Sequence, residues 1–235
     1  MKCLFVGLLA ILPSLGCADA KELRASIDVL FDATEAAELA RTLPVDRQVR
    51  FRLRTTGAEA PSGVLVFISP LDTSVFPESW APLFDELNLS WIGFDGFGNA
   101  TPTAQRMLAA MMALKVVQRD GPVDGARVYV AGLSGGGRVA SQLITRFPHH
   151  FSGALYIVGA DFFMPDDPLR SLVLSKRFVF LTGSRDFNRR EMREVFARYQ
   201  KAGARHARLL DLEGYRHRMP DAPKMRAALE LLDAR

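Results

Sequence analysis

The stretch "AGLSGGGRVA" at residues 131–140 decides how the rest of the chain is interpreted. Gly132, Ser134 and Gly136 match the pattern G-x-S-x-G. In this pattern the serine lies on a sharp turn between a strand and a helix, and the flanking glycines remove side chains that would clash across that turn. The preceding "RVYVAG" is typical of a strand, and the residues that follow fit a helix. We therefore interpret Ser134 as an exposed nucleophile; the alternative is a glycine-rich turn without chemistry.

Apolar, β-branched segments alternate with helical segments from residue 64 to the end of the chain. The expected strands are 64–69, 89–96, 127–132, 153–159, 177–183 and 206–214, and the expected helices are 77–87, 101–120, 137–147, 188–203 and 222–234. A further segment, 47–54, alternates polar and apolar residues as a half-exposed antiparallel strand does. This order predicts an α/β fold in which helices cover both faces of a mostly parallel sheet. Ligands bind at the carboxyl edge of such sheets.

The position of each histidine along its strand or helix decides which one could serve Ser134 as a base. His149 and His150 follow the helix that leads away from Ser134, and His206 begins a strand, so these three are expected at the opposite edge of the sheet. His217 directly follows the last strand and is expected on the same edge as Ser134. We therefore predict His217 as the general base.

A histidine base requires a carboxylate that orients its ring. Asp186 follows the strand 177–183, and Asp161 follows the strand 153–159, so both are expected on the edge that carries Ser134. Asp186 lies on the strand nearer in sequence to the histidine, and we prefer it. Asp161 remains the alternative.

A serine that attacks a carbonyl group also needs N–H donors that stabilise the negative oxygen of the tetrahedral intermediate. We expect the backbone N–H of Gly135 as one donor. The second should come from the loop after the strand 64–69, where Pro70 has no N–H, so that Leu71 or Asp72 must donate; we prefer Leu71. Two other segments follow strand ends on the same edge, and from them we expect the substrate-binding residues Asp95, Phe97, Asn99 and Phe162.

The first twenty residues resemble an export signal. Lys2 precedes an apolar run of about ten residues, which is too short to span a bilayer. Small residues at Ala18 and Ala20 predict cleavage after Ala20, which leaves a single domain at 21–235 in the periplasm or outside the cell. The alternative is a lipoprotein signal in which Cys17 is acylated, and only then do we expect a membrane contact.

Composition excludes several classes of protein. Hydrophobic residues make up 49% of the chain and charged residues 24%, which indicates a globular protein rather than a disordered one. The net charge of +4 comes from scattered basic residues, so we expect no nucleic-acid partner. Both cysteines, Cys3 and Cys17, lie in the signal segment, and the mature chain would therefore hold no disulfide and no thiolate metal site.

From about residue 47 onward the chain resembles an α/β-hydrolase. The segments "RVYVAGLSGGGRVAS", "LTGSRDFNR" and "GYRHRMP", which carry Ser134, Asp186 and His217, resemble secreted serine esterases of the polyhydroxybutyrate-depolymerase and feruloyl-esterase type. The resemblance implies an eight-stranded, mostly parallel sheet with an antiparallel edge. Two departures are visible. The common His-Gly segment after the third strand is replaced by residues 69–71, and Arg216 stands where a glycine often precedes the histidine.

These observations predict an exported serine hydrolase, most simply a carboxylesterase that forms an acyl-enzyme and uses no metal or cofactor. Its substrate would be a small ester or the end of an ester polymer, because no insertion is long enough to form a large lid. A peptidase or thioesterase would use the same three residues. A binding protein that uses a hydrolase scaffold without catalysis is a further alternative. The oligomeric state is not readable from the sequence.

Overall fold

The structure is a computed structural model, and it describes residues 20–42, 48–58, 60–166 and 168–234. The expected signal segment, apart from Ala20, lies outside the described residues, as does Cys17. No helix in the described part of the chain is both long enough and apolar enough to cross a membrane.

Eight strands form one sheet. They are β1 (Lys21–Ala25), β2 (Val49–Arg54), β3 (Ser62–Ile68), β4 (Leu89–Asp95), β5 (Val123–Leu133), β6 (Gly153–Ile157), β7 (Arg177–Arg185) and β8 (Ala207–Arg216). Their order across the sheet is β1-β2-β4-β3-β5-β6-β7-β8. The β1–β2 and β2–β4 pairs are antiparallel, and all other pairs are parallel. The prediction of a mostly parallel sheet with an antiparallel edge is confirmed.

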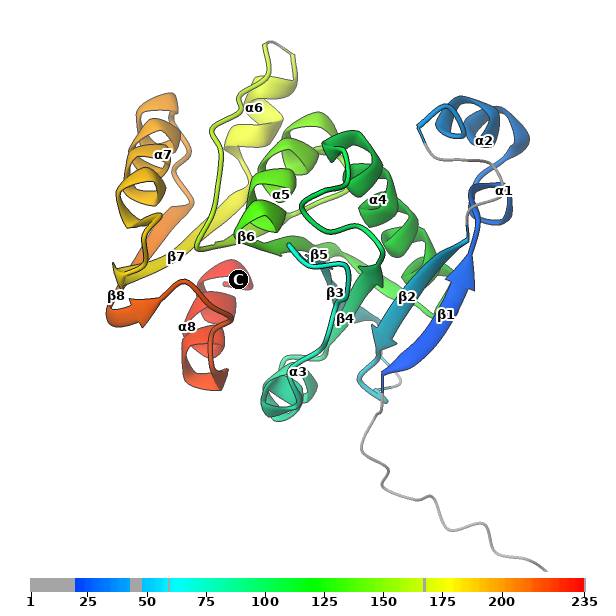
Figure 1. Cartoon of the computed structure of the whole chain (residues 1–235), viewed down its shortest axis with the longest axis horizontal. Helices are drawn as coiled ribbons and strands as arrows, with labels where there is room; N and C mark the ends of the chain where they lie inside the picture. The colour runs from blue at the N-terminus through cyan, green and yellow to red at the C-terminus, as the bar shows by residue number, and fades with distance from the viewer. Residues whose placement is uncertain (1–19, 43–47, 59, 167, 235) are drawn as a thin grey trace, which may run out of the picture.

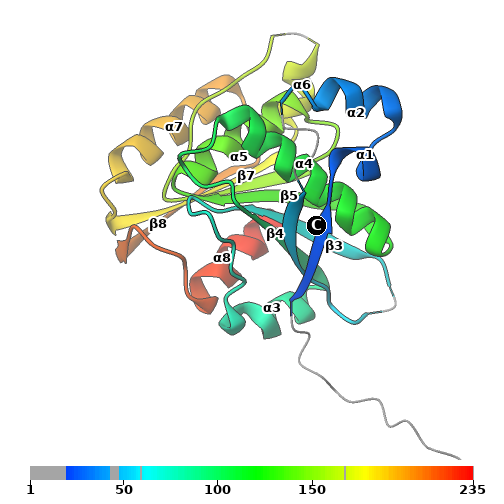
Figure 2. The same cartoon turned by 45° about the vertical axis from the view of Figure 1, so that its right-hand side comes forward.

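Helices cover both faces of this sheet (Figure 1). They are α1 (Ile27–Leu30), α2 (Ala33–Leu39), α3 (Ala81–Glu86), α4 (Thr103–Asp120), α5 (Gly135–Arg146), α6 (Leu169–Leu174), α7 (Arg189–Ala202) and α8 (Ala222–Leu232). Helices α4, α5 and α7 lie on one face, and α3 and α8 lie on the other. Figure 2 shows α1 and α2 near the β1 edge, on the side of α4.

Strand β3 shows how the core is divided between the two faces. Val64, Val66 and Ile68 pack into the cluster beneath α4 and α5, whereas Leu65 and Phe67 pack into the cluster on the side of α3 and α8. Alternate side chains of a strand point to opposite faces, so a strand covered on both sides must be apolar throughout. This is why the continuous apolar run was a reliable signal for a central strand.

The sequence pattern missed four elements: β1, α1, α2 and α6. Strand β1 has the sequence KELRA and pairs only with β2 at the edge of the sheet, where most of its side chains face solvent. Helix α2 is capped at its amino end by Asp32, whose carboxylate accepts hydrogen bonds from the N–H groups of Thr34 and Glu35. Such short or exposed elements depend on edge pairing and capping rather than on an apolar face, so periodicity does not reveal them.

Candidate active site

Ser134 occupies a strained turn between β5 and α5. Its backbone angles are φ 53° and ψ −118°, in a region that non-glycine residues rarely adopt. A Cβ atom at Gly132 would lie 2.2 Å from the carbonyl carbon of Gly136, and one at Gly136 would lie 1.9 Å from the oxygen of Ile68. Both glycines of the motif are therefore required by close backbone approach, as the sequence interpretation proposed.

Gly137, the extra glycine of the opening stretch, has a packing function. A Cβ atom at this position would lie 2.0 Å from the carbonyl oxygen of Gly159, which follows β6. The first turn of α5 therefore rests directly on the backbone beyond the neighbouring strand. This contact holds the amino end of α5, and with it Ser134, against the edge of the sheet.

His217 lies beside Ser134. Its Nε2 atom is 2.9 Å from Ser134 Oγ, and its Nδ1 atom is 2.8 Å from Asp186 Oδ1. The loop that carries His217 is held at its far side, where Trp80 Nε1 donates to the carbonyl oxygen of Pro220 at 3.0 Å. Since β8 starts at Ala207, parallel to β7, His206 lies at the opposite edge, as predicted.

Asp186 is buried just beyond β7, and its side chain is fully shielded from solvent. Besides His217, the carboxylate accepts hydrogen bonds from Thr182 Oγ1 at 2.7 Å and from the Asn188 N–H at 3.0 Å. These two donors fix the plane of the carboxylate. The structure thus places Asp186, the preferred candidate, against the histidine.

Asp161, the alternative acid, has a different partner. Its Oδ1 atom accepts from Arg138 Nη1 at 2.7 Å, and the same guanidinium also pairs with Glu191. Hydrogen bonding to Glu191 raises the pKa of Arg138, and the same bond lowers the pKa of Glu191. Asp161 therefore belongs to an ion-pair cluster beside the cavity.

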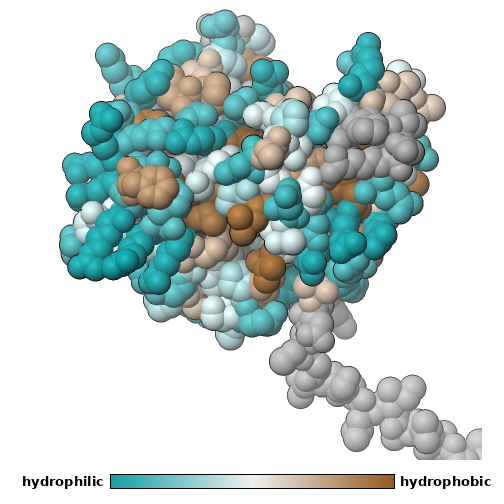
Figure 3. Space-filling model, in the orientation of Figure 1, coloured by the Kyte–Doolittle hydropathy of each residue, from teal (hydrophilic) through white to brown (hydrophobic). Residues whose placement is uncertain are grey.

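An open cavity of ≈ 450 Å³ adjoins Ser134. It is lined by Asn99, Thr103, Arg106, Ser134, Gly135, Arg138, Val139, Gln142, Asp161, Phe187 and Asn188. The exposed ring of Phe187 stacks on His217 with ring centroids 3.9 Å apart. On the face shown in Figure 3, hydrophobic residues form small patches among hydrophilic ones.

Sequence reasoning missed Phe187, Arg106 and Arg138 as parts of this site. Phe187 directly follows Asp186, and Arg138 lies one helical turn after Ser134, so both spacings offered a usable signal. Arg106 reaches the site from α4, and no pattern in the sequence indicated that contact. Arg216, where the family often has glycine, is exposed and does not line the cavity.

Among the four predicted substrate-binding residues, only Asn99 lines the cavity. Asp95 instead forms an ion pair with Arg52 at 3.0 Å. Phe97 is 1% exposed and packs in the core, and Phe162 packs edge-on against Tyr199. These three residues follow strand ends on the expected edge but do not line the cavity at Ser134, so their contact with a substrate stays a prediction.

The two predicted N–H donors differ in availability. Gly135 is the first residue of α5, where backbone N–H groups have no partner within the helix. The N–H of Leu71 instead donates to Ser69 Oγ at 3.0 Å, and Leu71 does not line the cavity. The Leu71 N–H, which the sequence analysis preferred as the second donor to the negative oxygen, is therefore engaged in a local turn.

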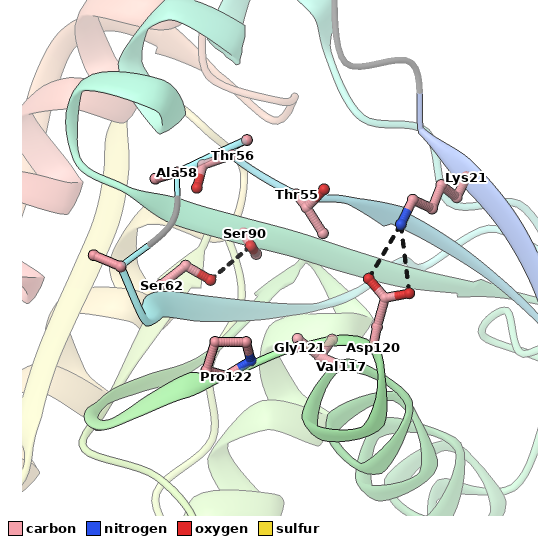
Figure 4. A pocket seen from close by; sticks show the side chains of 12 residues that line it. Lys21, Thr55, Thr56, Ala58, Ser62, Ser90, Val117, Asp120, Gly121 and Pro122 are labelled. Carbon is pink, nitrogen blue, oxygen red and sulfur yellow. Dashed lines mark hydrogen bonds and ion pairs between the residues drawn. The ribbon is translucent and has the colours of Figure 1, made fainter.

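A second cavity of ≈ 300 Å³ lies at the opposite edge of the sheet (Figure 4). Its charged residues, Lys21 and Asp120, pair with each other at 3.3 Å, and the hydroxyls of Ser62 and Ser90 lie 2.9 Å apart. No group of three or more metal-ligating side chains occurs within the described residues. The hydrogen-bonded side chains of Ser134, His217 and Asp186 lie at the other edge of the sheet, where Ser134 lines the first cavity.

No protein-family model matches the chain, and no curated protein matches it. Among solved structures, a ferulic acid esterase gives a TM-score of 0.63 at 14% identity, covering 90% of this chain and 95% of its own. A thermostable esterase gives 0.60 at 15% identity, covering 84% and 56% respectively. A puromycin hydrolase gives 0.58 at 17% identity, covering 80% and 37%. The chain has the α/β-hydrolase fold. It spans 37% of the length of the puromycin hydrolase and 56% of that of the thermostable esterase, so the likeness concerns the hydrolase domain architecture alone.

Proposed function

We propose that this protein is a serine hydrolase that cleaves carboxylic esters through an acyl-enzyme. The observation that carries the proposal is the unbroken line of hydrogen bonds from Ser134 Oγ through His217 to Asp186. A serine hydroxyl is a weak nucleophile unless a base within hydrogen-bond reach removes its proton. Ser134 has such a base, and the base has an orienting acid.

The hydrogen bonds determine which nitrogen of His217 carries the proton. An ionised carboxylate only accepts hydrogen bonds, so Nδ1 must donate to Asp186. Nε2 then presents its lone pair to the Ser134 hydroxyl. This tautomer is the one required for a general base.

The reaction follows from this arrangement. As His217 Nε2 takes the proton, Ser134 Oγ attacks the ester carbonyl carbon, and the carbonyl oxygen becomes negative beside the N–H of Gly135 and the amino end of α5. The imidazolium, stabilised by Asp186, passes its proton to the departing alcohol. Water then attacks the acyl-enzyme with His217 again as the base and releases the acid.

The open cavity supports a small ester or the end of an ester polymer as substrate. Two of the solved structures with this fold are a ferulic acid esterase and a thermostable esterase, and both names fit the proposed reaction. We also propose export, which rests on the charged and apolar pattern of the first twenty residues and on cleavage after Ala20.

Labelling with a fluorophosphonate probe tests the proposal, together with hydrolysis of a short-chain chromogenic ester. We expect wild type and Ser175→Ala, which changes an exposed serine at the end of α6, to be labelled and active. Ser134→Ala should be neither. Equal rates for wild type and Ser134→Ala would contradict the proposal. A panel of acyl, hydroxycinnamoyl, polyhydroxyalkanoate, thioester and peptide substrates then separates the esterase from the peptidase and thioesterase alternatives.

A further inference from the structure

The reaction proposed above lacks one hydrogen-bond donor. Negative oxygens in acyl transfer are commonly held by two N–H groups, and Gly135 supplies one. Ser69 Oγ closes a local turn: it accepts from the Leu71 N–H at 3.0 Å and donates to the carbonyl oxygen of Thr73 at 2.8 Å. The loop 70–72 also does not line the cavity at Ser134. The residues that do line the cavity are therefore the better candidates for the second donor.

Asn99 lies directly against Gly135. A Cβ atom at Gly135 would lie 2.2 Å from Asn99 Oδ1 and 3.0 Å from Asn99 Nδ2. The Asn99 side chain is accessible and lines the cavity that contains Ser134. Within the described residues its Nδ2 atom donates to no protein acceptor, so both of its hydrogens are available.

Arg106 determines which way the Asn99 amide faces. Its Nη1 atom donates to Asn99 Oδ1 at 3.3 Å. Because a guanidinium only donates, the amide atom that faces it must be the oxygen, and the NH₂ group faces away from it. Arg106 is 4% exposed, and burial lowers its pKa. In the described part of the chain it pairs with no carboxylate.

The other contacts of Arg106 connect the segments around Ser134. Nη2 donates to the carbonyl oxygen of Ser69 at 2.8 Å, and Nη1 reaches that of Gly135 at 3.4 Å. The backbone N–H of Asn99 in turn donates to the carbonyl oxygen of Pro70 at 2.8 Å. The end of β3, the loop after β4 and the start of α5 are thus held together before any substrate arrives.

We propose that Asn99 Nδ2 is the second donor to the negative oxygen and that Arg106 is the positioning residue that orients it. This proposal rests on the proposed function. A Cβ atom lies about 2.5 Å from its own backbone nitrogen, so the Gly135 nitrogen and Asn99 Nδ2 are at most about 5.5 Å apart. Two donors that bind one oxygen at about 2.9 Å each are at most about 5.8 Å apart, and the pair satisfies that limit.

Steady-state kinetics on a short-chain ester test the assignment. Asn99→Ala should lower kcat by about 10²-fold to 10³-fold, the usual loss for one such donor, and should change KM little. Asn99→Asp keeps an oxygen that accepts from Arg106 but has no N–H, so its kcat should fall at least as far as that of Asn99→Ala. Gln105→Ala, which removes a carboxamide beside Arg106 outside the cavity, is the matched control and should retain wild-type kcat.

Two further measurements separate orientation from general stability. Arg106→Gln should lower kcat when it is introduced into the wild-type enzyme. When it is introduced into Asn99→Ala, the further fall in kcat should be less than about threefold, because the amide that Arg106 orients is then absent. A boronic acid that forms a tetrahedral adduct on Ser134 should bind more weakly to Asn99→Ala, whereas a ground-state ester analogue should not.

The possible outcomes distinguish this proposal from the proposed function. Wild-type kcat in Asn99→Ala, with activity abolished in Ser134→Ala, would overturn the Asn99 assignment and leave the hydrolase intact. Full activity in Ser134→Ala would overturn both. Equal weakening of the boronic acid and the ground-state analogue would show that Asn99 is a binding residue only, which also contradicts the assignment.

Discussion

Asp186→Asn tests how the acid contributes to catalysis. The Asn188 N–H can only donate, so it should keep the amide oxygen of the variant at the position of Oδ1. The amide nitrogen then faces Thr182, whose hydroxyl can rotate and accept. The variant oxygen still accepts from His217 Nδ1. The substitution therefore removes the negative charge while the hydrogen-bond geometry and the tautomer are retained.

The expected loss follows from the lost attraction between this charge and the imidazolium. The Nδ1–Oδ1 distance is 2.8 Å, which puts the two charge centres about 4 Å apart. At an effective dielectric constant of about 20, that attraction is about 4 kcal/mol. A barrier raised by about 4 kcal/mol slows the reaction by about 10³-fold.

Single-turnover acylation by a chromogenic ester measures this step directly. Asp161→Asn is the matched control: it removes the other aspartate near Ser134, which pairs with Arg138 rather than with His217. Its loss should stay below about tenfold, because Arg138 keeps Glu191 as a partner. A larger loss in Asp161→Asn than in Asp186→Asn would refute the assignment of the acid. A loss below tenfold in Asp186→Asn would refute the electrostatic reasoning.

Three predictions concern stability. Ser134→Gly should abolish activity yet raise the free energy of unfolding by about 1 kcal/mol, because glycine relieves the backbone strain at φ 53°. Urea denaturation of this variant beside Ser134→Ala measures the change. The same denaturation midpoint in the two variants would contradict the prediction. Gly137→Ala should lower the melting temperature and the activity together, since its methyl group would lie 2.0 Å from the carbonyl oxygen of Gly159. A wild-type melting temperature together with wild-type activity would disprove the packing function of Gly137. Burial raises the pKa of Asp233, but hydrogen bonds from Arg127 and Tyr129 outweigh this and hold the pKa below its usual value. The stabilisation from this group is therefore present above the usual carboxyl pKa and is lost as the pH falls through the folded-state pKa. Asp233→Asn should cost about 3 kcal/mol at neutral pH, because it removes the ion-pair partner of the buried Arg127, and it should flatten the acid limb of the stability profile.

The sequence anticipated the candidate site unevenly, and the reason is physical. A strand-to-helix turn at Ser134 is encoded locally, since glycines and apolar periodicity report backbone sterics and burial within about ten residues. The edge on which His217 lies also followed from the order of strands and helices. The inward or outward direction of Asp95, Phe97 and Phe162 depended on loops whose path is set by contacts with distant segments, such as the ion pair of Asp95 with Arg52.

The sequence by itself determined the α/β architecture, the strained serine turn and the histidine on its edge, because parallel strands must align their carboxyl ends. Only the tertiary structure decided between the two acids: the carboxylate of Asp186 reaches His217, whereas a guanidinium from α5 binds Asp161. Only the tertiary structure also brought Arg106 across from α4 to Asn99. Such contacts between side chains on separate elements have no period or spacing in the sequence, since they depend on how the folded layers meet.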